Sequence, residues 1–210
     1  MLRLRSLTPV TYLCKLLGIH SLVAFLQLEL FRVYKYKNQE TKGKSLIILF
    51  QEVFHLIIIG EKINGSIPSV AKAIAERDSE FIKERARKQA AANATYIDCC
   101  ASVPEAEEVE TLKWMIDCIQ EVTDLPISVD SPSADVLTQA YKFCKRPGIF
   151  NSVSGEGDKI DKIFPLMAQE ENKDWQVIAL LSDDTGIPKC AADRLRVFDK
   201  IMTKAKEYHI

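Results

Sequence analysis

The sequence lacks the cysteine and histidine spacings that mark zinc sites and disulfide frameworks. Its six cysteines form no C-x-x-C pair, and none stands at a zinc-finger spacing from the three histidines. Scattered thiols of this kind are typical of a reducing compartment, so we expect a cytoplasmic protein with no bound metal. The cysteines are Cys14, Cys99, Cys100, Cys118, Cys144 and Cys190, and the histidines are His20, His55 and His209.

The chain also lacks the basic excess that binding to nucleic acid requires. Residues 61–210 carry 20 Lys or Arg against 26 Asp or Glu, whereas residues 1–60 carry 8 against 3. The larger part is therefore mildly acidic and has no electrostatic footprint for a nucleic acid. A hydrophobic content of 47% in 210 residues is enough for one good core, which predicts a single globular domain.

No apolar run is long and pure enough to predict a membrane span. The most apolar stretch, residues 16–30, is interrupted by four polar residues, and no clear signal-peptide cleavage site follows it. We expect residues 1–55 to be a poorly defined N-terminal extension. The alternatives are an appended segment with little fold of its own, a loosely packed amphipathic helix, a membrane anchor, and a gene-model extension upstream of the natural start near His55.

From residue 56 onward, short apolar segments alternate with segments of helical periodicity. The apolar segments are rich in β-branched and aromatic residues, as buried strands are. Strands separated by helices of this length predict right-handed βαβ crossovers and a parallel sheet. The expected strands cover residues 56–62, 95–100, 127–130, 148–152 and 176–181; the expected helices cover 66–76, 78–93, a segment beginning near 102, 134–144, 158–169 and 191–208.

Two of the expected helices carry explicit start signals. Ser102 and Glu105 have the spacing of a capping box, and Pro104 between them suits a first helical turn, where its missing N–H costs nothing. Ser133 is placed to cap the helix over residues 134–144.

Five βα units fit into the chain from residue 56 onward. A complete (β/α)8 barrel needs about 250 residues, so the pattern predicts either a shorter open α/β sheet or an incomplete barrel. An open parallel sheet exposes an edge and part of its core. We therefore expect the chain to self-associate, for example as a homodimer.

Polar residues stand where the expected strands end. Asp130 and Asn151 end two successive strands, Asp98 lies near the end of a third, and Glu61 and Asn64 follow the first. The carboxyl ends of parallel strands meet at one mouth, so these side chains are expected to lie together. A carboxylate beside an amide suits a flat heterocycle, because the carboxylate accepts from N–H groups while the amide both donates and accepts. The alternative is that they are turn and cap residues, which these types also favour.

In their order and spacing, the strand-end motifs resemble those of the pterin-binding barrel family. Within it they are most similar to the methyltetrahydrofolate:corrinoid protein methyltransferases, with the folate domain of cobalamin-dependent methionine synthase and dihydropteroate synthase as cousins. The resemblance covers residues 56–210 and predicts a pterin-binding domain there. The motifs are IGEKING at 59–65, YID at 96–98, VDS at 129–131, NSVSGE at 151–156 and TGIPK at 185–189.

The resemblance implies roles for four residues. In that family the residues matching Asp130 and Asn151 hydrogen-bond the pterin ring, and Asn151 is the expected catalytic residue, stabilising the transition state near N5. Asn64 and Asp98 match positions that line the same mouth. Two further pterin contacts of the family come from later strands, so a C-terminally truncated barrel is expected. Cys100 stands where some relatives have Asn.

The activity that the resemblance implies is methyl transfer in one-carbon metabolism. The N5-methyl group of methyltetrahydrofolate would pass to the cobalt of a corrinoid (cobalamin) that a partner protein carries. The alternatives are a dihydropteroate synthase, against which the lack of a Gly-rich loop at residues 99–104 argues, and an inactive pterin-binding fragment. Residues 155–157, Gly-Glu-Gly, lack the dinucleotide-binding pattern and are expected to form a loop that closes over the pterin.

Overall fold

Each apolar segment between two helices forms one strand of a single parallel sheet. The computed structural model describes residues 57–210, so the expected extension over residues 1–55 lies outside the described residues. The strands are β1 (Ile59–Gly60), β2 (Tyr96–Cys100), β3 (Ile127–Asp130), β4 (Ile149–Gly155) and β5 (Gln176–Asp183).

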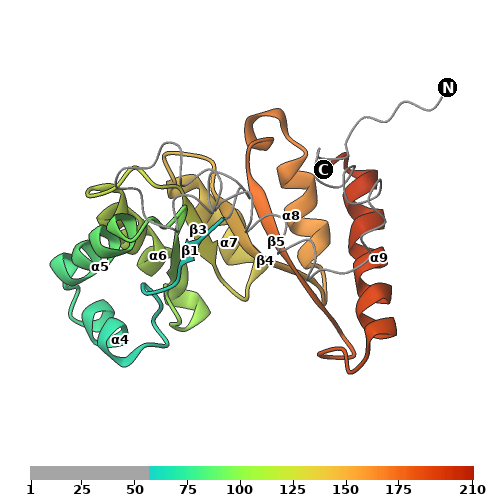
Figure 1. The fold of residues 1–210 in the computed structure, drawn as a ribbon, viewed down its shortest axis with the longest axis horizontal. Helices are drawn as coiled ribbons and strands as arrows, with labels where there is room; N and C mark the ends of the chain where they lie inside the picture. The colour runs from blue at the N-terminus through green and yellow to red at the C-terminus, as the bar shows by residue number, and fades with distance from the viewer. Residues whose placement is uncertain (1–56) are drawn as a thin grey trace, which may run out of the picture. The chain divides into compact units, whose positions relative to one another are not determined.

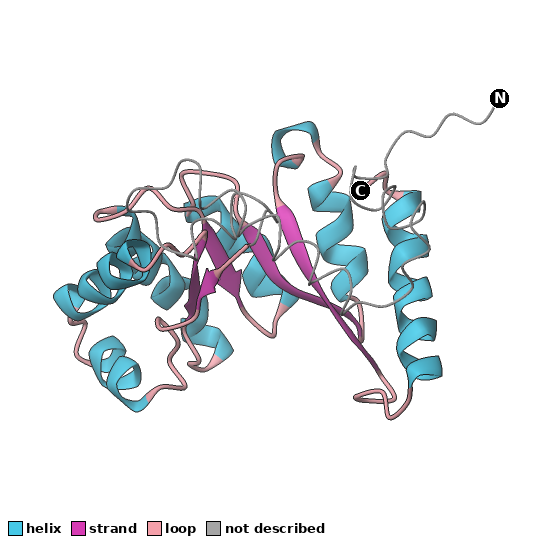
Figure 2. Cartoon of the chain, in the orientation of Figure 1, coloured by secondary structure: helices cyan, strands magenta, loops and turns pink. Residues whose placement is uncertain are grey.

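The strands lie in the sheet in the same order as in the chain, and every neighbouring pair is parallel (Figures 1 and 2). Right-handed crossovers that always step in one direction put all helices on one face, as in a (β/α)8 barrel and unlike a doubly wound sheet, whose order reverses. The described residues thus form five consecutive βα units of an incomplete barrel, which confirms the prediction from sequence.

The helices cover the outer face of this curved sheet. Contacts between successive helices run from α4 to α9 in chain order. Even α9, the longest helix of the described part, does not reach membrane-spanning length, and residues 57–210 include no helix long and apolar enough to cross a bilayer. The helices are α4 (Pro68–Ala75), α5 (Ser79–Ala91), α6 (Glu105–Gln120), α7 (Ala134–Ala140), α8 (Lys159–Met167) and α9 (Ala191–Glu207), with short 3-10 turns at Tyr141–Phe143 and Glu170–Asn172.

Side chains alternate between the two faces of the strands. Ile97, Val129 and Phe150 are fully buried and join the core under the helices. The residues that alternate with these along each strand point to the concave face of the sheet, because successive side chains of a strand face opposite ways. On that face, β2, β3 and β4 carry the polar side chains of Asp98, Ser128, Asp130 and Asn151 besides apolar ones, and the candidate site is built from these polar groups.

The bounds of β1 and β4 differ most from the sequence prediction. β1 stops at Gly60 because α5 binds the next backbone groups: the Gln89 Oε1 atom accepts from the Lys62 N–H at 2.8 Å, and Arg85 donates to the Lys62 carbonyl at 3.3 Å. β4 extends to Gly155, and its register against β5 shifts twice, between Asn151 and Val153 and between Ser154 and Gly155.

The predicted capping box at Ser102 is wrong. Helix α6 begins at Glu105 with Pro104 as its N-cap residue, and no side chain caps it. Ser102 has a φ of 50°, and its hydroxyl donates to Asn64 Oδ1 at 3.4 Å. A tertiary contact with the first βα loop therefore replaces the local cap. The predicted cap at Ser133 is confirmed, since its Oγ accepts from the Val136 N–H.

Candidate functional site

Four residues form one row across the carboxyl ends of the first four βα units. Cys100 pairs in register with Asp130, Asp130 pairs with Asn151, and Asn64 forms an isolated parallel bridge to Cys100. Register partners in a parallel sheet point to the same face. Three of the four residues predicted as site residues, Asn64, Asp130 and Asn151, thus lie side by side at the mouth of the half-barrel.

Asp98, the fourth predicted site residue, lies one layer below this row. It precedes Cys100 by two positions on β2, so it shares the concave face, and only 2% of it is exposed. Its Oδ1 atom accepts hydrogen bonds from Ser128 Oγ at 2.7 Å and from Asn151 Nδ2 at 3.2 Å. Asp98 is therefore connected to the mouth through Asn151.

The first βα loop fixes Asn64 in the row. Its Oδ1 accepts from the Ser66 N–H at 2.9 Å and from the Ser102 hydroxyl. Gly65 comes next, and a Cβ on it would lie 2.0 Å from the Ala101 carbonyl oxygen, so only glycine fits this close approach. Because the Asn64 oxygen is already occupied, its amide N–H groups remain for a ligand.

Burial shapes the electrostatics of the two aspartates. It raises the pKa of Asp98 to about 6; the Asp130 and Glu61 carboxylates act in the same direction, and the hydrogen bonds from Ser128 and Asn151 oppose it. Burial also raises the pKa of Asp130, with the Glu61 charge adding to the effect and a hydrogen bond from Cys100 opposing it. Both carboxyl groups thus ionise less readily than in water.

The cysteines near the row are buried free thiols. Burial raises the pKa of Cys100 to about 12, and it raises the pKa of Cys99 far above its ordinary value. Cys99 points into the core, whereas Cys100 faces the mouth beside Asp130. Neither thiol is activated as a nucleophile, since the thiolate is the reactive form.

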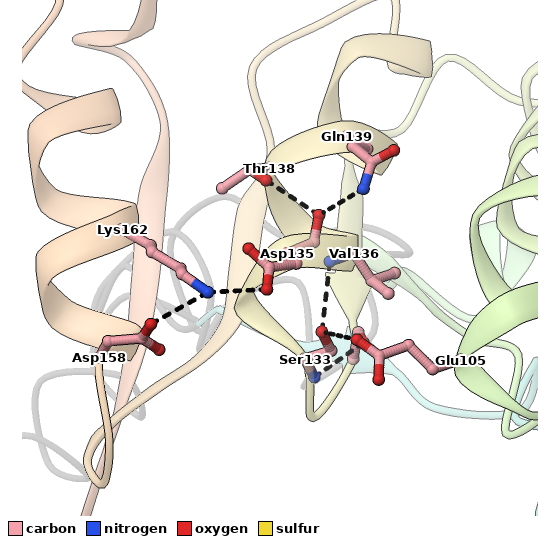
Figure 3. Close-up of polar contacts among 9 residues, drawn as sticks. Glu105, Ser133, Asp135, Val136, Thr138, Gln139, Asp158 and Lys162 are labelled. Carbon is pink, nitrogen blue, oxygen red and sulfur yellow. Dashed lines mark hydrogen bonds and ion pairs between the residues drawn. The ribbon is translucent and has the colours of Figure 1, made fainter.

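Helix α6 holds the loop that follows Asp130 (Figure 3). The Ser133 hydroxyl donates to Glu105 Oε1 at 2.6 Å, and the Ser133 N–H donates to Ser131 Oγ at 3.1 Å. Glu108 is only 3% exposed; burial raises the pKa of its carboxyl, the neighbouring Ser131 lowers it, and its Oε1 atom has no hydrogen-bond partner among the described residues. Glu105 and Glu108 of α6 thus both neighbour the turn that follows Asp130.

We expect Ser133→Ala to lower the free energy of unfolding by about 1 kcal/mol, because it removes an N-cap from α7. Urea denaturation of the full chain measures this change. Ser79→Ala is the matched control: Ser79 begins α5, but Asp78 is the N-cap residue there, so a change within about 0.5 kcal/mol is expected. Equal effects of the two variants would contradict the assigned cap.

The loop at residues 155–157 is attached to β5 and α9. Ser182 donates to Glu156 Oε1 at 2.8 Å, the Gly157 N–H donates to Asp184 at 2.9 Å, and Lys200 donates to the Gly155 carbonyl at 2.7 Å. Beside it, the pKa of Asp183 is lowered to about 2, chiefly by its hydrogen bond from Arg196. That this loop closes over a pterin stays a prediction.

Three residues near the site were not predicted from sequence as part of it: Ser128, Glu105 and Glu108. Ser128 is fully buried and pairs in register with Asp98. Its signal was available, because it is the one polar residue inside the apolar part of its strand and stands two positions before Asp130, on the same face. The two glutamates had no such signal, since an acidic first turn is common in any helix.

Comparison with known proteins agrees with this geometry. The profile of the family described as pterin binding enzyme matches residues 62–208, which span all of the strand ends after β1. The chain belongs to the pterin-binding enzyme family. The family relationship predicted from the strand-end motifs is thereby confirmed.

One similar protein has a name that is more specific than the description of the family. The protein named methylcorrinoid:tetrahydrofolate methyltransferase from Eubacterium limosum is 43% identical over 155 residues. The aligned region is 74% of this chain and 57% of that protein, so the chain spans little more than half of the relative's length. The name carries the same two reactants, a corrinoid and a folate, that the strand-end motifs predicted.

Proposed function

We propose that residues 56–210 bind the pterin ring of a tetrahydrofolate and that the protein transfers a methyl group between N5 of that folate and the cobalt of a corrinoid on a partner protein. The observation that carries the proposal is the register pair of Asp130 and Asn151 at the barrel mouth. The 43% identity to a corrinoid and tetrahydrofolate methyltransferase supports the choice of reactants.

The row offers a hydrogen-bonding pattern that fits the edge of a pterin. An ionised Asp130 only accepts, Asn64 has its N–H groups left to donate, and Asn151 both accepts and donates. The aminopyrimidinone edge of a pterin likewise combines N–H donors with ring-nitrogen and carbonyl acceptors. Asp130 and Asn64 would therefore orient the ring, and Asn151 would lie nearest the reacting nitrogen.

The chemistry requires control of charge at N5. When the methyl group leaves the folate, the N5–C bond breaks, its electron pair stays on N5, and N5 gains a proton or a strong hydrogen bond; the cobalt(I) electron pair forms the new Co–C bond. An amine is a poor leaving group without such help. The second N–H of Asn151 can supply a hydrogen bond, while Asp130 holds the ring in line for displacement.

The relative's name gives the opposite direction of transfer, from methylcorrinoid to tetrahydrofolate. Forward and reverse transfer pass through one transition state, so residues that stabilise it serve both directions. Net direction then depends on the concentrations and free energies of the reactants. We propose that this chain, in the cytoplasm, acts on a corrinoid that its partner supplies.

A spectroscopic assay tests the proposal directly. The full chain is mixed with methyltetrahydrofolate and free cobalt(I) corrinoid, and the cobalt absorbance is followed; the reverse reaction starts from methylcorrinoid and tetrahydrofolate. Protein-dependent conversion supports methyl transfer. Folate binding without conversion in either direction supports pterin binding and contradicts methyl transfer.

Asp130→Ala is expected to weaken folate binding about ten- to a hundredfold, since hydrogen bonds to a charged group contribute about 1.5–3 kcal/mol. Titration calorimetry with methyltetrahydrofolate measures the change. Because burial raises the pKa of Asp130, wild-type binding should also weaken as the pH falls through that raised value.

Asp124→Ala is the matched control for this titration. Asp124 precedes the same strand at its other end, and its side chain is 93% exposed. Its removal should leave the affinity for folate unchanged. An Asp130→Ala protein that folds and still binds folate like the wild type would remove Asp130 from the site.

A further inference from the structure

Asp98 and Asn151 are joined across the intervening strand β3. Both donors to Asp98 meet one atom, Oδ1: Ser128 Oγ at 2.7 Å from β3 and Asn151 Nδ2 at 3.2 Å from β4. Ser128 is fully buried, and Asp98 is nearly so. The carboxyl group is therefore fixed from below and has one direct connection to the row of residues at the mouth.

This connection determines how the Asn151 amide is turned. An ionised carboxylate only accepts hydrogen bonds, so the amide must direct its NH2 group, and not its oxygen, toward Asp98. The Asn151 backbone is fixed as well, because its carbonyl accepts from the Ser131 N–H at 2.9 Å. With one N–H bound to Asp98, the oxygen and the second N–H of Asn151 are left for the mouth.

We propose that Asp98 is a positioning residue that holds the Asn151 amide in a single orientation and so decides which amide atoms a ligand meets. Without this acceptor, the amide could turn by 180° and exchange its donor and acceptor. The inference rests on the proposed function for the identity of the ligand, a folate. The orientation of the amide is a property of the free protein.

The environment of Asp98 makes this orientation depend on pH. The groups that act on it are the carboxylates of Asp130 on β3 and Glu61 after β1, besides its hydrogen-bond donors on β3 and β4. They and burial raise its pKa to about 6. Below that pH the carboxyl carries a proton and can donate as well as accept, so it no longer enforces one amide orientation.

Protonation of Asp98 also makes the free energy of unfolding depend on pH. The folded protein keeps the proton up to a pH of about 6, whereas the ordinary pKa is 3.8. The folded state therefore binds more protons between these values, and this group lowers the free energy of unfolding as the pH rises through the window. Asp98→Asn should abolish that component of the pH dependence.

The test follows the side-chain amide of Asn151 by nuclear magnetic resonance in the full chain, with the signals assigned by their loss in Asn151→Ala. In the wild type we expect them to shift with a midpoint near pH 6 and to exchange slowly with water above it. In Asp98→Asn the amide oxygen of the new side chain can still accept from the Asn151 amide. Slow exchange of the Asn151 signals should therefore remain, while their shift with pH should vanish. In Asp98→Ala both should vanish.

Asp183→Asn is the matched control. Asp183 is also buried and ends the neighbouring strand β5, but its partners are Thr185 and Arg196. It should leave the Asn151 signals and their midpoint unchanged. A midpoint near pH 6 that survives in Asp98→Asn would overturn the proposal, as would slow exchange that survives in Asp98→Ala; where the alanine variant does not fold, the asparagine variant decides.

Folate titration separates this inference from the proposed function. Wild-type signals that behave as expected in a protein that binds no folate would support the positioning role and contradict the function. A protein that binds folate while Asp98→Asn keeps the wild-type midpoint would support the function and contradict the positioning role.

Discussion

Replacing Asn151 by alanine is expected to slow methyl transfer by about 10²–10³-fold, the loss that follows removal of a single donor to a charge developing in a transition state. Folate binding should weaken by no more than about tenfold, because a neutral hydrogen bond contributes only about 0.5–1.5 kcal/mol. The difference arises because N5 gains charge only as its bond to the methyl group breaks. Single-turnover cobalt absorbance gives the rate, and a folate titration gives the affinity.

The control for this variant is Gln176→Ala. Gln176 carries an exposed amide at the first residue of β5, at the opposite end of the sheet from the row. Its removal should change neither rate nor affinity. If Asn151→Ala lowered rate and affinity by the same factor, Asn151 would be a binding residue alone, and the assignment of a transition-state role would be wrong.

Replacing Phe150 by alanine is expected to lower the free energy of unfolding by about 3–5 kcal/mol, the range for a fully buried phenylalanine. The side chain is completely buried, and its ring lies 4.7 Å from Trp175 and 5.4 Å from Tyr141, centroid to centroid. The loss is the sum of the burial free energy that the ring contributed and the cost of the cavity that remains. Urea denaturation followed by far-ultraviolet circular dichroism measures it.

Phe198→Ala is the matched control for Phe150→Ala. Phe198 lies on α9 and is 45% exposed, so its removal opens no cavity and should change stability by about 0.5 kcal/mol or less. Phe150 immediately precedes Asn151 on β4 and faces the opposite side of the sheet. A loss in Phe150→Ala no larger than that in Phe198→Ala would show that this side chain does not anchor the strand that carries Asn151.

Local sequence signals predicted the strands best where no other element competes for the backbone. The segment 127–130 is a short, largely apolar run that ends in the polar Asp130, and it is found as β3 with the predicted bounds. The first strand is shorter than predicted because Gln89 and Arg85, more than twenty residues away in sequence, bind the Lys62 backbone. Hydrogen bonds between distant residues leave no periodic trace in the sequence around Lys62.

The two predicted helix caps also show local sequence signals in one case and contacts between distant residues in the other. Ser133 caps the helix that directly follows it, as its local pattern predicted. Ser102 has an equally good local pattern, yet its hydroxyl donates to Asn64 and lies 3.3 Å from the Cys100 sulfur. The N-cap position of α6 is Pro104, and Ser102, with a φ of 50°, contacts the first βα loop instead of the helix.

The sequence by itself determined the βα alternation, the parallel order and the family, because apolar runs that end in polar residues report which segments become buried strands and where those strands finish. It also identified Asn64, Asp98, Asp130 and Asn151 as candidates. Only the tertiary structure decided that Asn64, Asp130 and Asn151 share one row while Asp98 lies beneath them, bonded to Asn151. The physical reason is register: which residues of neighbouring strands stand opposite each other depends on how whole strands pair and how helices pack behind them, and no single segment encodes that.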